Sequence, residues 1–168
     1  MSGRVTVLVC GDTMRGDDGL GIRAAAGIPA ATTALAEIRQ IGQLSPDDLL
    51  DAKGPVIVVD AVYGPSPGEL VDMPLVDLAG SAQHALSPST HALPLPTAVA
   101  LCIQLRGEAP QGRFLGLAGA DFGIGAEVSE SVAEALPQLT TAIERWIGAL
   151  AHPAALATAT TTLEGDRA

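Results

Sequence analysis

Residues 4–26 read RVTVLVCGDTMRGDDGLGIRAAA, and this stretch decides the class of fold. Residues 4–10 are an almost continuous run of β-branched and aliphatic side chains, which predicts a buried strand. The glycine-bearing segment 11–21 follows it, and the alanine-rich segment 22–26 then predicts a helix. A buried strand, a glycine loop and a helix in this order are typical of α/β proteins with a parallel sheet.

The rest of the chain continues this alternation of strands and helices. The strand expected at residues 55–61 is apolar throughout, as a central parallel strand buried on both faces requires. The strand at 69–73 follows it so closely that we expect an antiparallel edge strand, and residues 75–92 have an irregular pattern. The sequence predicts a three-layer αβα sandwich around a mostly parallel, five-stranded twisted sheet with one antiparallel edge strand. The remaining expected elements are strands at 34–41 and 113–118 and helices at 47–52, 93–105 and 129–150.

Length and composition limit the class of protein. The 168 residues fit one domain, expected at residues 1–150, and the Ala- and Thr-biased segment 151–168 is predicted to be disordered. A formal charge of −10 leaves no basic stripe for nucleic acid. Mean hydropathy is positive, but no apolar run approaches the roughly 18 to 20 residues that cross a bilayer. We therefore expect a cytoplasmic protein in which Cys10 and Cys102 are buried, reduced thiols.

The first loop has the spacing of a phosphate-binding loop but not its chemistry. Gly11 and Gly16 stand in the GxxxxG relation. Asp17 and Asp18, however, occupy the places where Lys and Ser or Thr would hold phosphate and magnesium. Because two carboxylates repel a phosphate, this pair argues against nucleotide binding. The sequence also has no GxSxG elbow and no HExxH motif, which excludes the hydrolase classes that use them.

Three residues are candidate metal ligands. One carboxylate of the Asp17–Asp18 pair can cap the following helix, and the other is then available for a cation. Asp60 ends an apolar strand, where aspartate is also a common turn former, and His91 lies on a loop, where a single histidine is usually structural. Loops that follow parallel strands meet at one edge of the sheet, so we expect Asp18, Asp60 and His91 to converge. Two carboxylates and an imidazole suit a borderline divalent ion and leave coordination positions open.

Four segments together resemble the hydrogenase maturation proteases. They are VLVCGDTMRGDDGLGIRAA (7–25), VIVVDAVYGPSPGEL (56–70), SPSTHALPLPTAVAL (87–101) and GADFGIGAEVSESVAEALP (119–137). The match is collinear over about residues 4–150. Members of that family are endopeptidases that remove a short C-terminal extension from the large subunit of a nickel-iron hydrogenase after nickel insertion. The resemblance implies this activity and makes the large-subunit precursor the expected partner.

The resemblance also implies roles for single residues. Asp18, Asp60 and His91 correspond by position to the family's nickel ligands, and the nickel is supplied by the precursor. Asp18 and Asp60 are the candidate catalytic residues, because one of these carboxylates would also steer the attacking water. Two positions depart from the family pattern. Asp12 stands where Asn is usual, and Cys10 stands where a small residue is usual.

Two alternatives to the peptidase hypothesis stay open. A non-catalytic nickel-sensing maturation chaperone would keep the same three ligands but would not cleave the precursor. A nucleotide-binding α/β protein would be protected by ATP or NAD against thermal unfolding. The sequence leaves open which hydrogenase is processed, which bond is cut and how many copies of the chain associate.

Overall fold

A five-stranded sheet with the strand order β2-β1-β3-β5-β4 forms the centre of the molecule. The computed structural model describes residues 4–64, 66–80 and 93–153. β1, β2, β3 and β5 run parallel, and β4 pairs antiparallel with β5. The predicted sheet, with its antiparallel edge strand, is therefore confirmed. The strands are β1 (Val5–Val9), β2 (Ala36–Gln40), β3 (Val56–Tyr63), β4 (Leu70–Pro74) and β5 (Gly112–Gly119).

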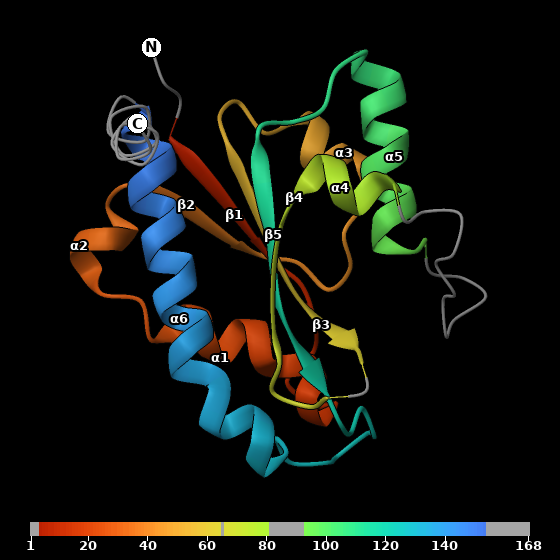
Figure 1. Ribbon diagram of the computed structural model, residues 1–168, viewed down its shortest axis with the longest axis vertical. Coiled ribbons are helices and arrows are strands. Elements are labelled where there is room, and N and C mark those ends of the chain that lie inside the picture. Colours follow the sequence, from red (N-terminus) through yellow and green to blue (C-terminus); the bar gives the residue numbers. More distant parts are fainter. Residues whose placement is uncertain (1–3, 65, 81–92, 154–168) are drawn as a thin grey trace, which may run out of the picture.

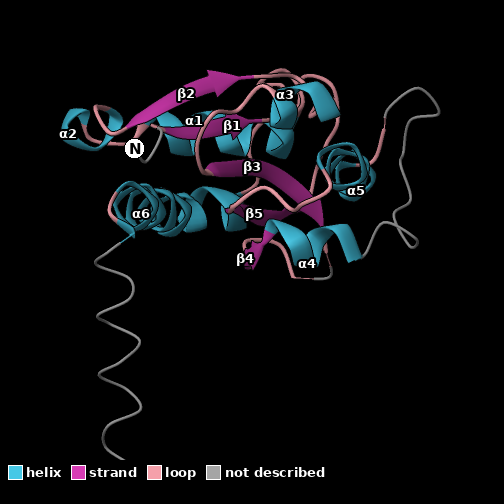
Figure 2. Cartoon of the chain, turned by 90° about the horizontal axis from the view of Figure 1, so that it is seen from above, coloured by secondary structure: helices cyan, strands magenta, loops and turns pink. Residues whose placement is uncertain are grey.

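Helices cover both faces of this sheet (Figures 1 and 2). A 3₁₀ turn, η1 (Gly16–Gly19), leads from the loop after β1 into α1 (Leu20–Ala26). Within the described residues no helix is both long and apolar enough to cross a bilayer. The arrangement is the predicted three-layer sandwich. One face carries α1, α2 (Ala30–Thr33) and α6 (Glu130–Ala151), and the other carries α3 (Pro46–Leu50), α4 (Leu75–Gly80) and α5 (Leu95–Arg106).

Alternation along the strands builds a separate core on each face. Val5, Val7 and Val9 of β1 belong to the core beneath α1 and α6. Leu8 and Cys10 belong to the core beneath α3, α4 and α5. β3 alternates in the same way. Because successive side chains of a strand point to opposite faces, a strand that is apolar at every position can only lie in the middle of such a sandwich.

The structure corrects the sequence predictions at three places. β4 is the antiparallel edge strand, but its partner is β5 rather than the preceding β3, because β5 lies between them. Residues 75–80 form helix α4, although the pattern there indicates irregular structure. Helix α2 was not expected, since a single turn has too few residues to show a period. The prediction of disorder at 151–168 falls mostly outside the described residues. Of this segment the structure describes only residues 151–153, and Ala151 is the last residue of α6.

An ion cluster joins β4 and β5 to α6. Asp72 accepts hydrogen bonds from Arg113 Nε at 2.9 Å, from Arg145 Nη2 at 2.8 Å and from Trp146 Nε1 at 2.9 Å. The Arg113 guanidinium also stacks 4.2 Å from the centre of the Trp146 ring. Burial alone would raise the pKa of Asp72, but the hydrogen bonds and the two positive charges outweigh it and lower the pKa. The edge of the sheet is thus held by charge as well as by apolar packing.

Candidate functional site

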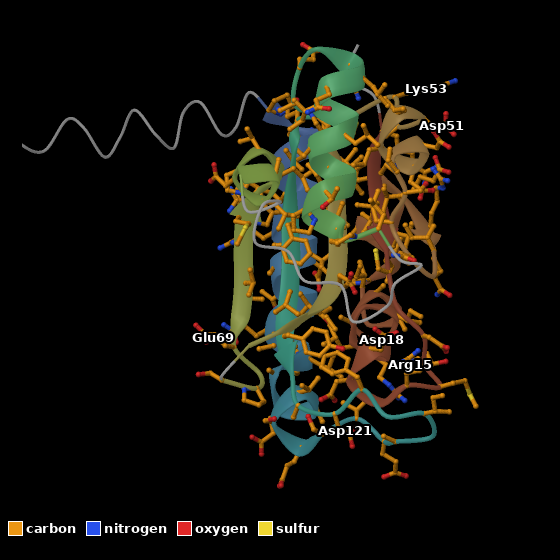
Figure 3. All side chains as sticks on the ribbon, turned by 90° about the vertical axis from the view of Figure 1, so that its right-hand side faces the viewer. Arg15, Asp18, Asp51, Lys53, Glu69 and Asp121 are labelled. Carbon is orange, nitrogen blue, oxygen red and sulfur yellow. The ribbon has the colours of Figure 1, made fainter. Side chains whose placement is uncertain are left out.

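The loops that follow β1, β2, β3 and β5 meet at the carboxyl end of the parallel strands, which is where open α/β sheets bind ligands. The N–H of Gly11 donates to the carbonyl of Gly42 at 3.0 Å and joins the first two of these loops. Figure 3 shows Asp18 and Asp121 toward this end of the sheet and Lys53 at the opposite end. The predicted convergence of the loops at one edge is confirmed for the described residues.

Glycine is required at two positions of the first loop. Gly11 has a φ of +107°, and a Cβ at this position would collide with the backbone carbonyl of Asp18. Gly16 has a φ of +54°, and a Cβ there would lie 2.6 Å from the carbonyl oxygen of Asp121. The tight loop also lets the N–H of Asp12 donate to Asp18 Oδ2 at 2.8 Å. The glycines therefore fold the loop around a carboxylate, not around a phosphate.

Asp17 is fully buried and binds the loop that follows β5. Its carboxylate accepts hydrogen bonds from the N–H groups of Ala120 at 2.7 Å, Asp121 at 3.0 Å and Ser129 at 2.7 Å. The Ser129 hydroxyl also donates to it at 2.8 Å. Burial alone would raise the pKa of Asp17, but these four hydrogen bonds outweigh it and lower the pKa.

The position of Asp17 resolves the choice between cap and ligand. Ser129 is the N-cap residue of the 22-residue helix α6, so the negative charge of Asp17 lies at the positive end of that helix. The expected cap on the following helix is not observed, because Asp17 instead accepts hydrogen bonds from the N-cap residue of α6 and from the loop after β5. Both carboxylate oxygens of Asp17 accept hydrogen bonds within the fold, whereas Asp18 accepts one described hydrogen bond and is the acid of the pair that is more available to a cation.

Asp18 and Asp60 lie close enough for the charge of one to act on the other. Burial raises the pKa of Asp60 to about 7, and the Asp18 carboxylate raises it further, against the Ala61 N–H that donates to Asp60 Oδ1 at 2.8 Å. Asp60 is therefore partly protonated near neutral pH. A cation bound between these acids would displace that proton and cancel their repulsion.

Cys10 is buried at the end of β1, beneath these two acids. Burial is the main cause that raises the pKa of its thiol, and the carboxylates of Asp60, Asp48 and Asp18 add to the effect. A backbone hydrogen bond from Leu44 opposes them. The thiol is therefore neutral and unreactive as a nucleophile, and it fills space in the core below the acid pair.

His91, the third predicted ligand, lies outside the described residues. The structure therefore brings together two of the three predicted site residues and does not describe the third. Within the described part of the chain, no group of three His, Cys, Asp or Glu side chains is arranged to hold a metal ion. The nearest described contact to His91 along the chain is at Leu93, whose carbonyl accepts a hydrogen bond from Gln43 Nε2 at 3.0 Å.

The sequence reasoning missed the roles of Asp17 and Ser129. The only signal in the sequence was that two acids are adjacent. In the structure both acids lie in the 3₁₀ turn η1. Such a turn has about three residues per turn, so adjacent side chains point about 120° apart. One acid can then be buried while its neighbour faces the loops. The sequence alone does not show which acid is which.

The same arrangement of strands and helices occurs in solved structures. The hydrogenase maturating endopeptidase HybD from E. coli matches with a TM-score of 0.67 and 18% identity, over 84% of this chain and 90% of that one. The hydrogenase 3 maturation protease matches with a TM-score of 0.65 and 25% identity, over 87% and 93% of the two chains. The chain has the fold of the hydrogenase maturation endopeptidases.

A third match within the hydrogenase maturation endopeptidase fold is HybD from Thermococcus kodakarensis, with a TM-score of 0.60 and 17% identity over 85% of this chain and 98% of that one. A scan of protein-family models and a search of curated proteins gave no match. The resemblance predicted from four sequence segments is thereby confirmed at the level of the fold.

We expect Asp17→Asn to lower the free energy of unfolding by about 3 kcal/mol or more, because buried N–H groups would lose a charged acceptor. The control is Glu127→Gln, which changes an exposed acid on the same loop and should shift stability by less than about 0.5 kcal/mol. Urea unfolding at pH 7 measures both. The Asp17 contribution is present above the ordinary pKa of aspartate, so the difference from wild type should shrink as the pH falls through the lowered pKa. Equal stabilities at pH 7 would contradict the anchoring role.

Asp60 should affect stability with the opposite pH dependence. Its pKa rises from 3.8 to about 7 on folding, so between these values the folded state holds a proton that the unfolded state has lost. The free energy of unfolding should therefore fall as the pH rises from about 4 to 7. A pKa shift of this size sets an upper limit of about 4 kcal/mol, and the actual decrease should be smaller because Asp60 is only half-buried. Asp60→Asn removes this loss. Wild type and Asp60→Asn compared by urea unfolding from pH 4 to pH 8 should diverge in favour of the variant, and parallel curves would show that Asp60 ionises normally.

Proposed function

We propose that the protein is an endopeptidase that removes the C-terminal extension from the large-subunit precursor of a nickel-iron hydrogenase after nickel insertion. The observation that carries the proposal is the acid pair Asp18 and Asp60 at the carboxyl end of the sheet, with the pKa of Asp60 raised to about 7. The fold supports the proposal, because the structures that share it bear the names of hydrogenase maturation endopeptidases.

The proposed ligands for nickel are Asp18, Asp60 and His91. The acid pair suits a cation, since the two ionised forms repel each other and only one need lose a proton when the ion binds. Chain geometry supports the third ligand. Leu93 is tied to Gln43, which follows Gly42 beside the first loop, and His91 precedes Leu93 by two positions in the sequence. Carboxylate and imidazole donors together suit a borderline divalent ion.

The reaction is hydrolysis of one peptide bond of the precursor. A carboxylate at the site, Asp18 or Asp60, orients a water molecule and accepts one of its protons while the water oxygen attacks the carbonyl carbon. The C–N bond then breaks, and the proton passes to the departing amine nitrogen. Nickel belongs to the substrate and positions the bond to be cut.

The test is cleavage of a nickel-loaded and a nickel-free large-subunit precursor by the purified protein, followed by mass spectrometry of the intact precursor. We expect loss of the extension from the loaded precursor at a rate at least about a hundredfold higher, because only that form makes the metal contact that positions the peptide bond. Equal rates would overturn the role of nickel. Binding without any change in mass would favour the non-catalytic chaperone.

The ligand assignment predicts that Asp18→Ala, Asp60→Ala and His91→Ala each abolish processing while the protein stays folded. Asp51→Ala is the control, because Asp51 is an exposed acid at the opposite end of the sheet (Figure 3). Thermal unfolding checks the fold, and precursor mass measures processing. Wild-type rates in all three ligand variants would refute the site.

A further inference from the structure

Exposed apolar side chains gather beside the acid pair. Met14 after β1, Tyr63 at the end of β3 and Ile124 after β5 are 66%, 68% and 83% exposed. Phe122 joins them, with its ring centroid 4.4 Å from that of Tyr63. We call these four residues the apolar rim. Large apolar side chains exposed together next to a candidate site commonly mark a surface that binds another molecule.

The backbone beneath the apolar rim is well fastened. The N–H of Gly125 donates to the carbonyl of Met14 at 2.7 Å and joins the loop after β5 to the loop after β1. The absence of a side chain at Gly119 makes room for the Phe122 ring, because a Cβ there would lie 2.5 Å from it. The buried Asp17 carboxylate holds the start of the same loop. The backbone that carries the rim is therefore held by hydrogen bonds within the fold, and the Tyr63 and Phe122 rings contact each other.

The surroundings of the rim are acidic. Asp12, Asp121 and Glu127 are exposed on the loops that carry Met14 and Ile124. Apart from the buried Asp17, residues 11–18 and 120–128 contain four acids and a single cation, Arg15. A second copy of this chain, with its own charge of −10, would bring like charges together at this surface. The charge pattern instead fits an occupant that is apolar and positively charged.

We propose that the apolar rim binds an apolar segment of the precursor polypeptide that carries basic side chains, next to the peptide bond held at Asp18 and Asp60. This inference rests on the proposed function and adds a specificity surface to it. The rim lies outside the acid pair, so its contacts with a flexible segment are made equally before and during bond cleavage. Such contacts change KM and leave kcat unchanged.

The test compares two double variants on the nickel-loaded precursor. Met14→Ser with Ile124→Ser removes two exposed members of the rim. Leu101→Ser with Leu105→Ser removes two exposed leucines from α5 and is the matched control. We expect the rim variant to raise KM at least about tenfold with kcat within about twofold, and the control to match wild type. An unchanged KM in the rim variant would overturn the proposal.

A binding measurement keeps this inference separable from the proposed function. Fluorescein-labelled peptides of equal length, one with Leu and Arg, one with Leu and Glu and one with Ser and Arg, are titrated and followed by anisotropy. We expect the Leu and Arg peptide to bind at least about tenfold more tightly than the other two, and to lose this advantage on the rim variant. That result without precursor cleavage would refute only the proposed function. Cleavage of the precursor without any preference among the three peptides would refute the rim proposal alone. The same conclusion would follow if sedimentation showed a dimer that the rim substitutions dissociate.

Discussion

The hydrogen bonds that the buried Asp17 carboxylate accepts determine how the carboxyl end of the sheet is organised. They join a loop near the start of the chain to the loop after β5 and to the N-cap residue of α6, across 112 residues of sequence. Three N–H groups and one hydroxyl converge on one charge, so the protein itself supplies hydrogen-bond donors to both carboxylate oxygens. The first loop and the loop after β5 are therefore positioned relative to each other by this contact.

The anchoring of Asp17 leaves its neighbour under different constraints. Asp18 receives one described hydrogen bond, from the N–H of Asp12, and its charge acts on the half-buried Asp60. The same residue type therefore has opposite properties at adjacent positions. One acid is held ionised by donors, and the other lies beside an acid whose pKa is raised. An acid pair of this kind is stable without a ligand only while one member keeps a proton, which makes the pair responsive to a cation.

The sequence predicts the layers well, because burial of β1 and β3 on both faces leaves a local pattern in residues 5–9 and 56–59. It does not predict that β4 pairs with β5, since that choice depends on where a strand some 40 residues later inserts. It also cannot separate Asp17 from Asp18. The chemistry of the two side chains is identical, and what distinguishes them is the position of Ser129, a contact with no local signature. Asp60 was recognisable because it follows the fully buried residues 56–59, although β3 continues beyond it to Tyr63.

The acid pair and the acidic loops around it bear on the timing of the proposed reaction. A free acidic site of this kind binds an uncharged peptide bond weakly, because among the described residues only the N–H of Asp12 is seen to donate to the Asp18 carboxylate when water is lost from it. A precursor that already carries a divalent ion changes this balance, since the ion displaces the proton of Asp60 and removes the repulsion between the carboxylates. The binding energy gained in this way is available only to the metal-loaded precursor, and it is gained beside the bond to be cut. On the proposed function, the order of events in maturation therefore follows from electrostatics at two side chains and needs no separate sensor.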